Sequence, residues 1–148
     1  MIDSDSLFRV LLVEDEPADA HLIRLAFEEN KVLVNLRHVH DGVEAFNFLR
    51  REAGYVDEVQ PDLILLDLNM PRMGGRQFLE KVKQDEALRH IPVVVLTTSD
   101  SESDILTSYN LGAAGYIVKP VDIDDFIRQV QTLEDYWITL VRKPHKPS

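Results

Sequence analysis

Residues 61–71 of the chain read Pro-Asp-Leu-Ile-Leu-Leu-Asp-Leu-Asn-Met-Pro. The central part, Leu63–Leu66, is an unbroken apolar run that leads directly into the carboxylate of Asp67. A short continuous apolar run between polar residues is typical of a strand buried on both faces of a parallel sheet. This stretch therefore predicts a central strand with an acid at its carboxyl end.

Four more apolar runs occur along the chain, and amphipathic helical patterns separate them. The runs are Phe8–Val13, Val32–Val39, Val93–Leu96 and Tyr116–Val118. The helical faces are Leu22, Ile23, Ala26 and Phe27; Val43, Phe46 and Leu49 after a capping Asp41; Phe78, Leu79 and Val82; Ile105, Leu106 and Tyr109 before Gly112; and a stretch from about Asp122 to Arg142. Such strand–helix alternation with short connections predicts an α/β fold, an open parallel sheet with helices on both faces.

The composition limits the classes of function. The 148 residues suffice for one domain with a sizeable core, since 45% are hydrophobic. Lys and Arg number 16 and Asp and Glu 26, a net charge of −10, which argues against a nucleic-acid partner and against docking on anionic lipid. The chain has no cysteine and no apolar run long enough to span a membrane. We therefore expect a cytoplasmic protein without disulfides or zinc–thiolate sites.

Polar side chains follow four of the five predicted strands at the points where they end. They are Glu14, Asp15 and Glu16 after the first strand, Asp67 after the third, Thr97 after the fourth and Lys119 after the fifth. The carboxyl ends of parallel strands meet at one edge of a sheet, where ligands bind in open α/β folds. The four ends therefore predict one site with carboxylates, a hydroxyl and an ammonium group.

This set of groups suits the binding of Mg²⁺ and a phosphoryl group. Neighbouring carboxylates repel unless a cation neutralises them, and oxygen-only ligands favour Mg²⁺. We expect Asp15 and Asp67 to be direct ligands and Glu14 to act through water. Lys119 and Thr97 can contact two other phosphoryl oxygens, and the free carboxylate oxygen of Asp67 can attack phosphorus.

Taken singly, each of these residues has an ordinary structural explanation. An acid at a strand end is usually a turn or helix cap, and we prefer this interpretation for Glu16, which precedes Pro17. A lone Thr97 or Lys119 is more often hydrogen-bonded or solvated. The five histidines lack metal-ligand spacing, and we expect solvated or structural roles for them: His21, His38, His40, His90 and His145. The coincidence of four groups at one edge nevertheless favours a functional site.

Several short motifs together match one known family. They are Val-Glu-Asp at 13–15, Leu-Leu-Asp-Leu-Asn-Met-Pro at 65–71, Gly74-Gly75, Thr97, and Ala-Gly-Tyr-Ile-Val-Lys-Pro at 114–120. On these motifs the chain resembles a response-regulator receiver domain over roughly residues 8–140. The resemblance implies a flavodoxin-like (βα)5 fold with sheet order 2-1-3-4-5. The periodicity alone gives only the strand–helix alternation.

The resemblance also implies a role for each matching residue. Asp67 is the expected phosphoacceptor, which makes the chain a phosphoprotein carrying an aspartyl phosphate, and Glu14 and Asp15 are the expected acid pair that binds Mg²⁺. The other implied roles are a backbone carbonyl ligand of Mg²⁺ (Asn69), a switch hydroxyl (Thr97), a phosphoryl-binding lysine (Lys119) and an aromatic switch residue (Tyr116). The Lys119–Pro120 bond is typically cis in this family. The Gly74-Gly75 pair allows backbone angles that other residues avoid.

We expect the receiver domain to span residues 7–142 and residues 143–148 to form a short basic tail. Because no output domain follows, the chain resembles a stand-alone response regulator of a two-component phosphorelay, whose output is a protein–protein contact. The expected donor is a histidine kinase that phosphorylates Asp67. The long last helix with Trp137 is similar to regulators that serve phytochrome-type photoreceptor kinases.

The last helix also carries apolar residues in the seam spacing of a coiled coil: Ile123, Phe126, Val130, Leu133, Trp137 and Leu140. For the first three we favour packing on the chain's own sheet. The last three form a candidate interface, since Trp is favoured at interface hot spots. Receivers commonly dimerise through the fourth helix, fifth strand and fifth helix, so we predict a homodimer that uses Tyr109, Phe126 and Trp137.

Two other functions share much of this arrangement. An aspartate-nucleophile phosphatase usually has a second acid two residues after the nucleophile, where this chain has Asn69, which is unable to act as general acid or base. A flavodoxin-like nucleotide- or flavin-binding module needs glycines or hydroxyls in its first loop, and this loop is Glu-Asp-Glu-Pro-Ala-Asp at 14–19. We therefore expect a signalling protein and not an enzyme.

Overall fold

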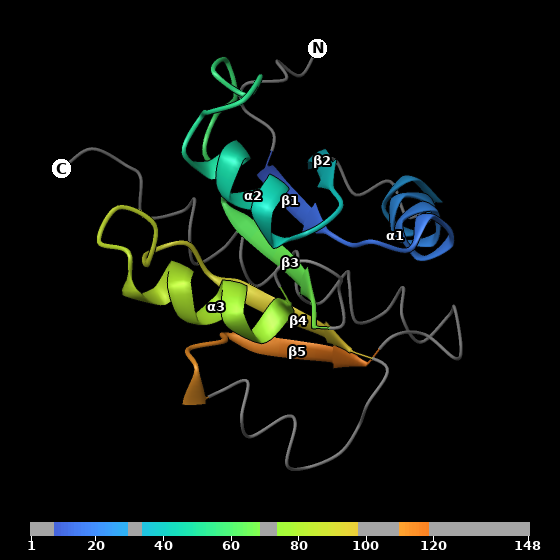
Figure 1. The fold of residues 1–148 in the computed structure, drawn as a ribbon. Coiled ribbons are helices and arrows are strands. Elements are labelled where there is room, and N and C mark those ends of the chain that lie inside the picture. The colour runs from blue at the N-terminus through green and yellow to red at the C-terminus, as the bar shows by residue number, and fades with distance from the viewer. Residues whose placement is uncertain (1–7, 30–33, 69–73, 98–109, 119–148) are drawn as a thin grey trace, which may run out of the picture.

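The computed structural model describes residues 8–29, 34–68, 74–97 and 110–118 of the chain. Within these residues five strands and three helices are assigned in chain order (Figure 1). Their bounds are β1 Phe8–Val13, α1 Pro17–Glu29, β2 Val34–Val39, α2 Gly42–Leu49, β3 Leu63–Asp67, α3 Gly75–Gln84, β4 Val93–Thr97 and β5 Gly115–Val118. No helix in this part of the chain is long and apolar enough to cross a membrane.

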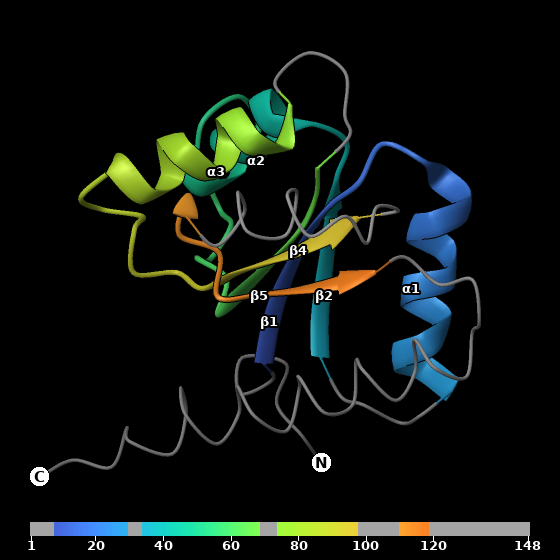
Figure 2. The same cartoon turned by 90° about the horizontal axis from the view of Figure 1, so that it is seen from below.

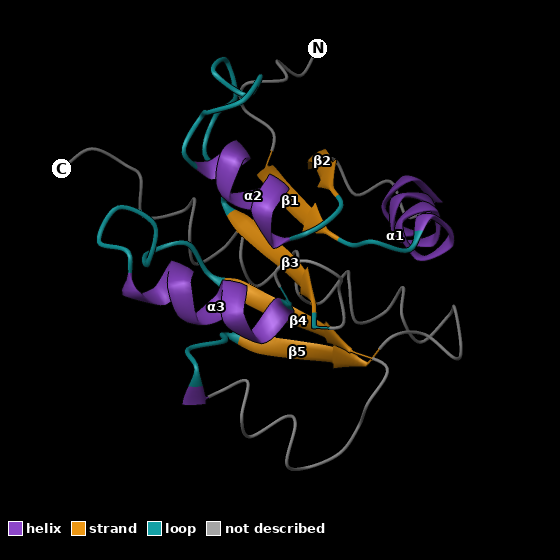
Figure 3. Cartoon of the chain, viewed as in Figure 1, coloured by secondary structure: helices purple, strands orange, loops and turns teal. Residues whose placement is uncertain are grey.

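The five strands form one sheet in the order β2-β1-β3-β4-β5, and every neighbouring pair is parallel (Figure 3). This is the flavodoxin-like order that the resemblance implied, and the predicted alternation of strands and helices is confirmed for the described elements. β1 lies between β2 and β3, so its carboxyl end has a neighbouring strand on each side.

Alternate residues of the strands face two separate apolar layers. Leu11 and Val13 of β1 pack in one layer with Phe78 of α3, whereas Leu12 packs in the other with Ile23 of α1. Figure 2 shows the same division, with α1 on one face of the sheet and α2 and α3 on the other. β3 is buried along its whole length, as predicted for the central strand. A fully buried side chain of this kind contributes about 1.5–3 kcal/mol to stability.

The strand boundaries differ slightly from the predicted ones. β3 and β4 each run one residue further, so Asp67 and Thr97 are the last residues of their strands. The second strand begins at Val34 in the described part of the chain, and β5 begins at Gly115. The predicted helical faces at 105–109 and 122–142, and the bond between residues 119 and 120, lie outside the described residues.

α2 buries a slightly different face from the one predicted. The predicted face is wrong at Val43, whose side chain is 37% exposed. The buried face starts one residue earlier, at Gly42, and continues at Ala45, Phe46 and Leu49. These are the i+3, i+4 and i+7 positions that lie on one side of a helix, so Val43 points away from the core.

Polar contacts at the start of α2 tie the helix to two other segments. Asp41 is the N-cap as predicted, and its Oδ1 accepts a hydrogen bond from the Glu44 amide at 2.9 Å. Glu44 Oε1 accepts from the His40 amide at 2.6 Å, and Oε2 accepts from the Tyr55 hydroxyl at 2.8 Å. Burial and the neighbouring Glu44 carboxylate raise the pKa of Tyr55 to about 12. Tyr55 therefore fastens the loop between α2 and β3 to the helix.

Replacing Tyr55 with Phe should lower the free energy of unfolding by about 1 kcal/mol at neutral pH, because a Glu44 oxygen loses its hydrogen bond. The raised pKa means that ionisation of Tyr55 opposes folding. The tyrosine thus contributes fully below pH 10 and loses its contribution as the pH rises to about 12. Urea denaturation of both proteins over this range should show the difference shrinking, and a difference that stays constant contradicts the assignment.

Candidate functional site

The register of the sheet brings the predicted acids together. β1 pairs with β3 so that Val13 lies opposite Leu66, and the next residues of the two strands are Glu14 and Asp67. One carboxylate oxygen from each of Glu14, Asp15 and Asp67 lies within 4.8 Å of the others. Glu14 and Asp67 are buried, at 0% and 2% exposed, and Asp15 is half-buried. These three residues form the carboxylate cluster.

The loop that carries Glu14 and Asp15 is held from the neighbouring strand β2. The Glu14 amide donates a hydrogen bond to the Val39 carbonyl at 3.0 Å. On the other side of the same residue, the Glu14 carbonyl lies 2.7 Å from His38 Nε2. The Glu14 side chain also turns back over its own loop, where Oε2 accepts from the Glu16 amide at 3.2 Å. The position of Glu14 is therefore fixed through both its backbone and its side chain.

Glu16 has the helix-start role that was preferred for it. Its Oε1 accepts a long hydrogen bond of 3.4 Å from the Ala18 amide, and its carbonyl accepts from the Ala20 amide at 3.0 Å. Pro17 is the first residue of α1, a position that needs no amide hydrogen. Glu16 is exposed and is not one of the three acids of the cluster.

Gly75 packs against the backbone beside Asp67. A Cβ atom at Gly75 would lie 2.4 Å from Leu68 Cα and 2.5 Å from the Asp67 carbonyl oxygen. The Gly75 amide also donates to the Leu68 carbonyl at 3.1 Å. Neither glycine adopts the backbone angles that such a pair allows, since Gly74 has φ −67° and neither residue has a positive φ. Gly75 is required because α3 starts so close to the end of β3.

Of the remaining predicted site residues, the structure describes the backbones of two. The backbones of Thr97 and Tyr116 lie in β4 and β5, and Thr97 ends the strand next to the one that ends in Asp67. The side chains of both residues lie outside what the structure describes. The same holds for the whole of Asn69, Lys119, Tyr109, Phe126 and Trp137.

His38 is a residue at the site that the sequence analysis did not single out. It was grouped with histidines expected to be solvated or structural, and the hydrogen bond of its ring to the Glu14 carbonyl is a structural contact. The available signal was its position, one residue before the end of the strand that the resemblance places beside β1. No spacing rule within a single segment reveals such a contact between strands.

The donor set of the cluster fits a hard divalent cation. Three carboxylates offer oxygen atoms only, and two of them are buried, so their mutual repulsion is strong without a neutralising charge. Mg²⁺ is commonly held by one or two carboxylates and keeps coordination sites for water and phosphate oxygens. Glu14, Asp15 and Asp67 are thus the described residues able to hold such an ion.

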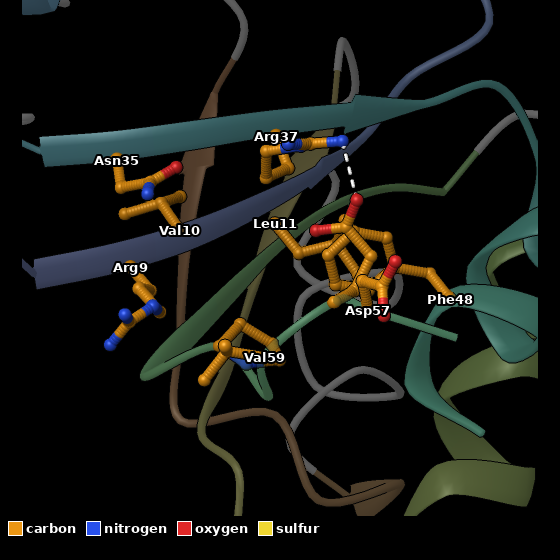
Figure 4. Close-up of a pocket in the computed structure, with 10 residues that line it drawn as sticks. Arg9, Val10, Leu11, Asn35, Arg37, Phe48, Asp57 and Val59 are labelled. Carbon is orange, nitrogen blue, oxygen red and sulfur yellow. Dashed lines mark hydrogen bonds and ion pairs between the residues drawn. The ribbon is translucent and has the colours of Figure 1, made fainter. Parts of the chain in front are cut away.

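A pocket lies elsewhere, beside residues of β1 and β2, Phe48 of α2 and residues 57–59 and 61 of the segment before β3 (Figure 4). Its volume is about 120 Å³, and two residues of its wall, Arg37 and Glu58, form an ion pair of 2.6 Å. Arg9 and Asn35, near the starts of the two strands, also line it, whereas the carboxylate cluster follows the strand ends. The pocket is therefore separate from the candidate site.

Comparison with known families gives the class of this protein. Residues 10–131 match the response regulator receiver domain. The chain belongs to this family, which confirms the resemblance that the motifs indicated and connects the chain with two-component signalling.

Individual relatives are similar over almost the whole chain. The response regulator Rcp1 of Synechocystis sp. is 39% identical over 135 residues, which cover 91% of this chain and 92% of Rcp1. The crystal structure of the phosphorylated cyanobacterial phytochrome response regulator RcpA has a TM-score of 0.83 and 40% identity, covering 92% of this chain and 97% of RcpA. The Mn²⁺-bound form of Rcp1 has a TM-score of 0.80 and 38% identity, covering 95% and 99%.

Replacing Gly75 with Ala should lower the free energy of unfolding by about 1–3 kcal/mol, because the added methyl group collides with backbone that must move. The atoms it meets belong to Asp67 and Leu68, so the affinity of the cluster for a divalent cation should fall as well. Urea denaturation and a Mn²⁺ titration measure the two effects.

The neighbouring Gly74 provides a matched control. A Cβ atom there meets nothing within 4 Å, and its φ of −67° suits any residue. Gly74→Ala should therefore cost less, since only the weaker preference of Ala for the helix N-cap remains. Equal losses in the two variants contradict the role assigned to Gly75.

Proposed function

We propose that this chain is a response regulator that accepts a phosphoryl group from a histidine kinase on Asp67. In this proposal Mg²⁺ is held by Glu14, Asp15 and Asp67 and by the backbone carbonyl of Asn69. Phosphorylation then changes contacts with protein partners, so the chain acts as a switch and not as an enzyme. The observation that carries the proposal is the cluster of three carboxylates within 4.8 Å at the carboxyl ends of β1 and β3.

The buried position of Asp67 suits a phosphoacceptor. Mg²⁺, when bound, neutralises the carboxylates and the phosphoryl oxygens so that these anionic groups can approach one another. A carboxylate oxygen of Asp67 that does not bind Mg²⁺ would then attack the phosphorus of the kinase phosphohistidine. An O–P bond forms, the N–P bond breaks, and the imidazole nitrogen keeps the electron pair. Asp67 is only 2% exposed, which limits the access of competing water.

The response of the chain is proposed to involve the neighbouring strand ends. Thr97 ends β4, which pairs with the strand that ends in Asp67. We propose that its hydroxyl and the Lys119 ammonium group move toward the phosphoryl group and that Tyr116 follows. The phosphoryl group favours this arrangement because it makes more contacts in it, so the population of the two states shifts.

A phytochrome-type photoreceptor kinase is the proposed partner. The support is the 40% identity to RcpA, described as a cyanobacterial phytochrome response regulator, and the 39% identity to Rcp1. We propose that the receiver domain spans residues 7–142 and that residues 143–148 form a tail. We also propose that the protein works in the cytoplasm with its kinase. Membership of the receiver family gives no support to the phosphatase or flavodoxin-like alternatives.

Replacing Asp67 with Asn should abolish phosphoryl uptake from a histidine kinase or from acetyl phosphate, because the amide lacks a nucleophilic carboxylate oxygen. The same loss is expected for wild type when EDTA removes Mg²⁺. Labelling with ³²P and electrophoresis under conditions that preserve acyl phosphates measure the uptake.

Asp57→Asn is the control, since Asp57 is an exposed aspartate in the loop before β3 and should leave labelling unchanged. Stoichiometric labelling of the Asp67→Asn protein would show that Asp67 is not the phosphoacceptor.

We also propose a homodimer that uses the fourth helix, β5 and the fifth helix, with Tyr109, Phe126 and Trp137 in the contact. The support is the seam-like spacing of apolar residues in the last predicted helix. Sedimentation at tens of micromolar should give the mass of a dimer, and Trp137→Ala should raise the dimer dissociation constant at least about tenfold. Wild type that sediments as a monomer, with and without a phosphoryl analogue, rules the dimer out.

A further inference from the structure

We propose that His38 is a positioning residue of the carboxylate cluster, orienting Glu14 and Asp15 toward a divalent cation through its hydrogen bond to the Glu14 carbonyl. This inference rests on the proposed cation site, and it assigns a task to a residue of the neighbouring strand. The relevant contact is the 2.7 Å distance between His38 Nε2 and the Glu14 carbonyl oxygen.

The direction of this hydrogen bond follows from its chemistry. A carbonyl oxygen only accepts, so Nε2 of His38 carries the hydrogen and donates it. The carbonyl belongs to the peptide group that joins Glu14 to Asp15, and this group is planar. By fixing the plane, His38 sets the direction in which the backbone enters Asp15. One hydrogen bond thereby orients both acids of the pair.

β2 holds the Glu14 residue at two points. The Val39 carbonyl accepts from the Glu14 amide at 3.0 Å, and His38 donates to the Glu14 carbonyl. The first contact continues the regular pairing of the two strands, which ends with Val13 opposite Val39. The second needs a side chain that can reach past the end of the ladder. Without His38, the carbonyl loses the contact that β2 makes with it.

The His38 ring is itself supported by a contact with a second histidine. Its centroid lies 4.6 Å from that of the His40 ring. His40 Nδ1 lies 3.0 Å from Glu44 Oε1, and Glu44 also accepts from Tyr55. His38 is half-buried, and its ring contacts both the Glu14 carbonyl and the His40 ring. A supported donor can hold its acceptor in one orientation, which is what a cation with strict geometry requires.

The affinity for Mg²⁺ relative to Ca²⁺ is a measurement that a general loss of stability would not change. Mg²⁺ and similar small ions demand near-octahedral geometry, whereas Ca²⁺ accepts more ligands in flexible arrangements. Loss of a positioning contact should therefore weaken Mg²⁺ binding more than Ca²⁺ binding. Mn²⁺ serves as the probe, because its free ion is counted directly by electron paramagnetic resonance, and Mg²⁺ and Ca²⁺ are measured by competition.

The test compares His38→Phe, His38→Gln and His90→Gln with wild type in the full chain. Phe keeps a ring beside His40 but donates no hydrogen bond, and its Mn²⁺ dissociation constant should rise about threefold to tenfold. Gln keeps a donor of similar reach and should restore most of the affinity. His90→Gln changes an exposed histidine in the segment before β4, away from the Glu14 contact, and should match wild type. In His38→Phe, Mg²⁺ should compete less well relative to Ca²⁺ than it does in wild type.

Unchanged Mn²⁺ affinity in His38→Phe overturns the inference, and so does an equal loss in His38→Gln, which makes the donor irrelevant. An equal loss of Mg²⁺ and Ca²⁺ affinity overturns it as well. If His38→Phe does not fold, as judged by circular dichroism, the comparison of His38→Gln with the donor-free His38→Met decides in its place. The proposed cation site fails separately: in that case wild type binds no Mn²⁺, or Asp15→Asn leaves its binding unchanged.

Discussion

The parallel pairing of β1 with both of its neighbours is the constraint on which the site depends. The register sets Val13 opposite Leu66 on one side and opposite Val39 on the other. The residues that come next, Glu14 just after β1 and Asp67 at the end of β3, therefore lie side by side at the edge of the sheet. Asp67 needs no long loop to position it, because it is itself the last residue of a paired strand. The register of the strands therefore determines where the carboxylates lie.

Burial strengthens the electrostatic interactions of these carboxylates. Apolar layers cover both faces of the sheet, and Glu14 and Asp67 are almost fully buried where the strands end. Like charges that lie close together and away from water repel one another, and a small divalent cation between them relieves this repulsion. The close approach of α3 at Gly75 completes this arrangement on the backbone side of Asp67.

Much of the fold and the three acids of the cluster could be predicted from the sequence because local rules govern them. Apolar runs mark buried strands, and residues that follow parallel strands collect at one edge. The order of strands required the resemblance, since apolar runs do not say which strands are neighbours. Val43 was misplaced because one residue of helical phase turns a side chain by about 100° away from the core.

The contacts that were missed or misinterpreted are those made between segments. A glycine is needed at position 75 because α3 starts close to the end of β3. The role of His38 comes from a hydrogen bond between β2 and the loop that follows β1. Neither is encoded in the spacing of nearby residues. Each depends on distances that exist only after the elements have packed.

The carboxylate cluster unites the ends of the first and third strands, so it is assembled only when the sheet is paired. A cation that binds there binds the folded chain and not the unfolded one. Its concentration then enters the folding equilibrium, and each tenfold rise above the dissociation constant adds about 1.4 kcal/mol to the free energy of unfolding. The melting temperature of the chain thereby becomes a measure of the free divalent cation around it.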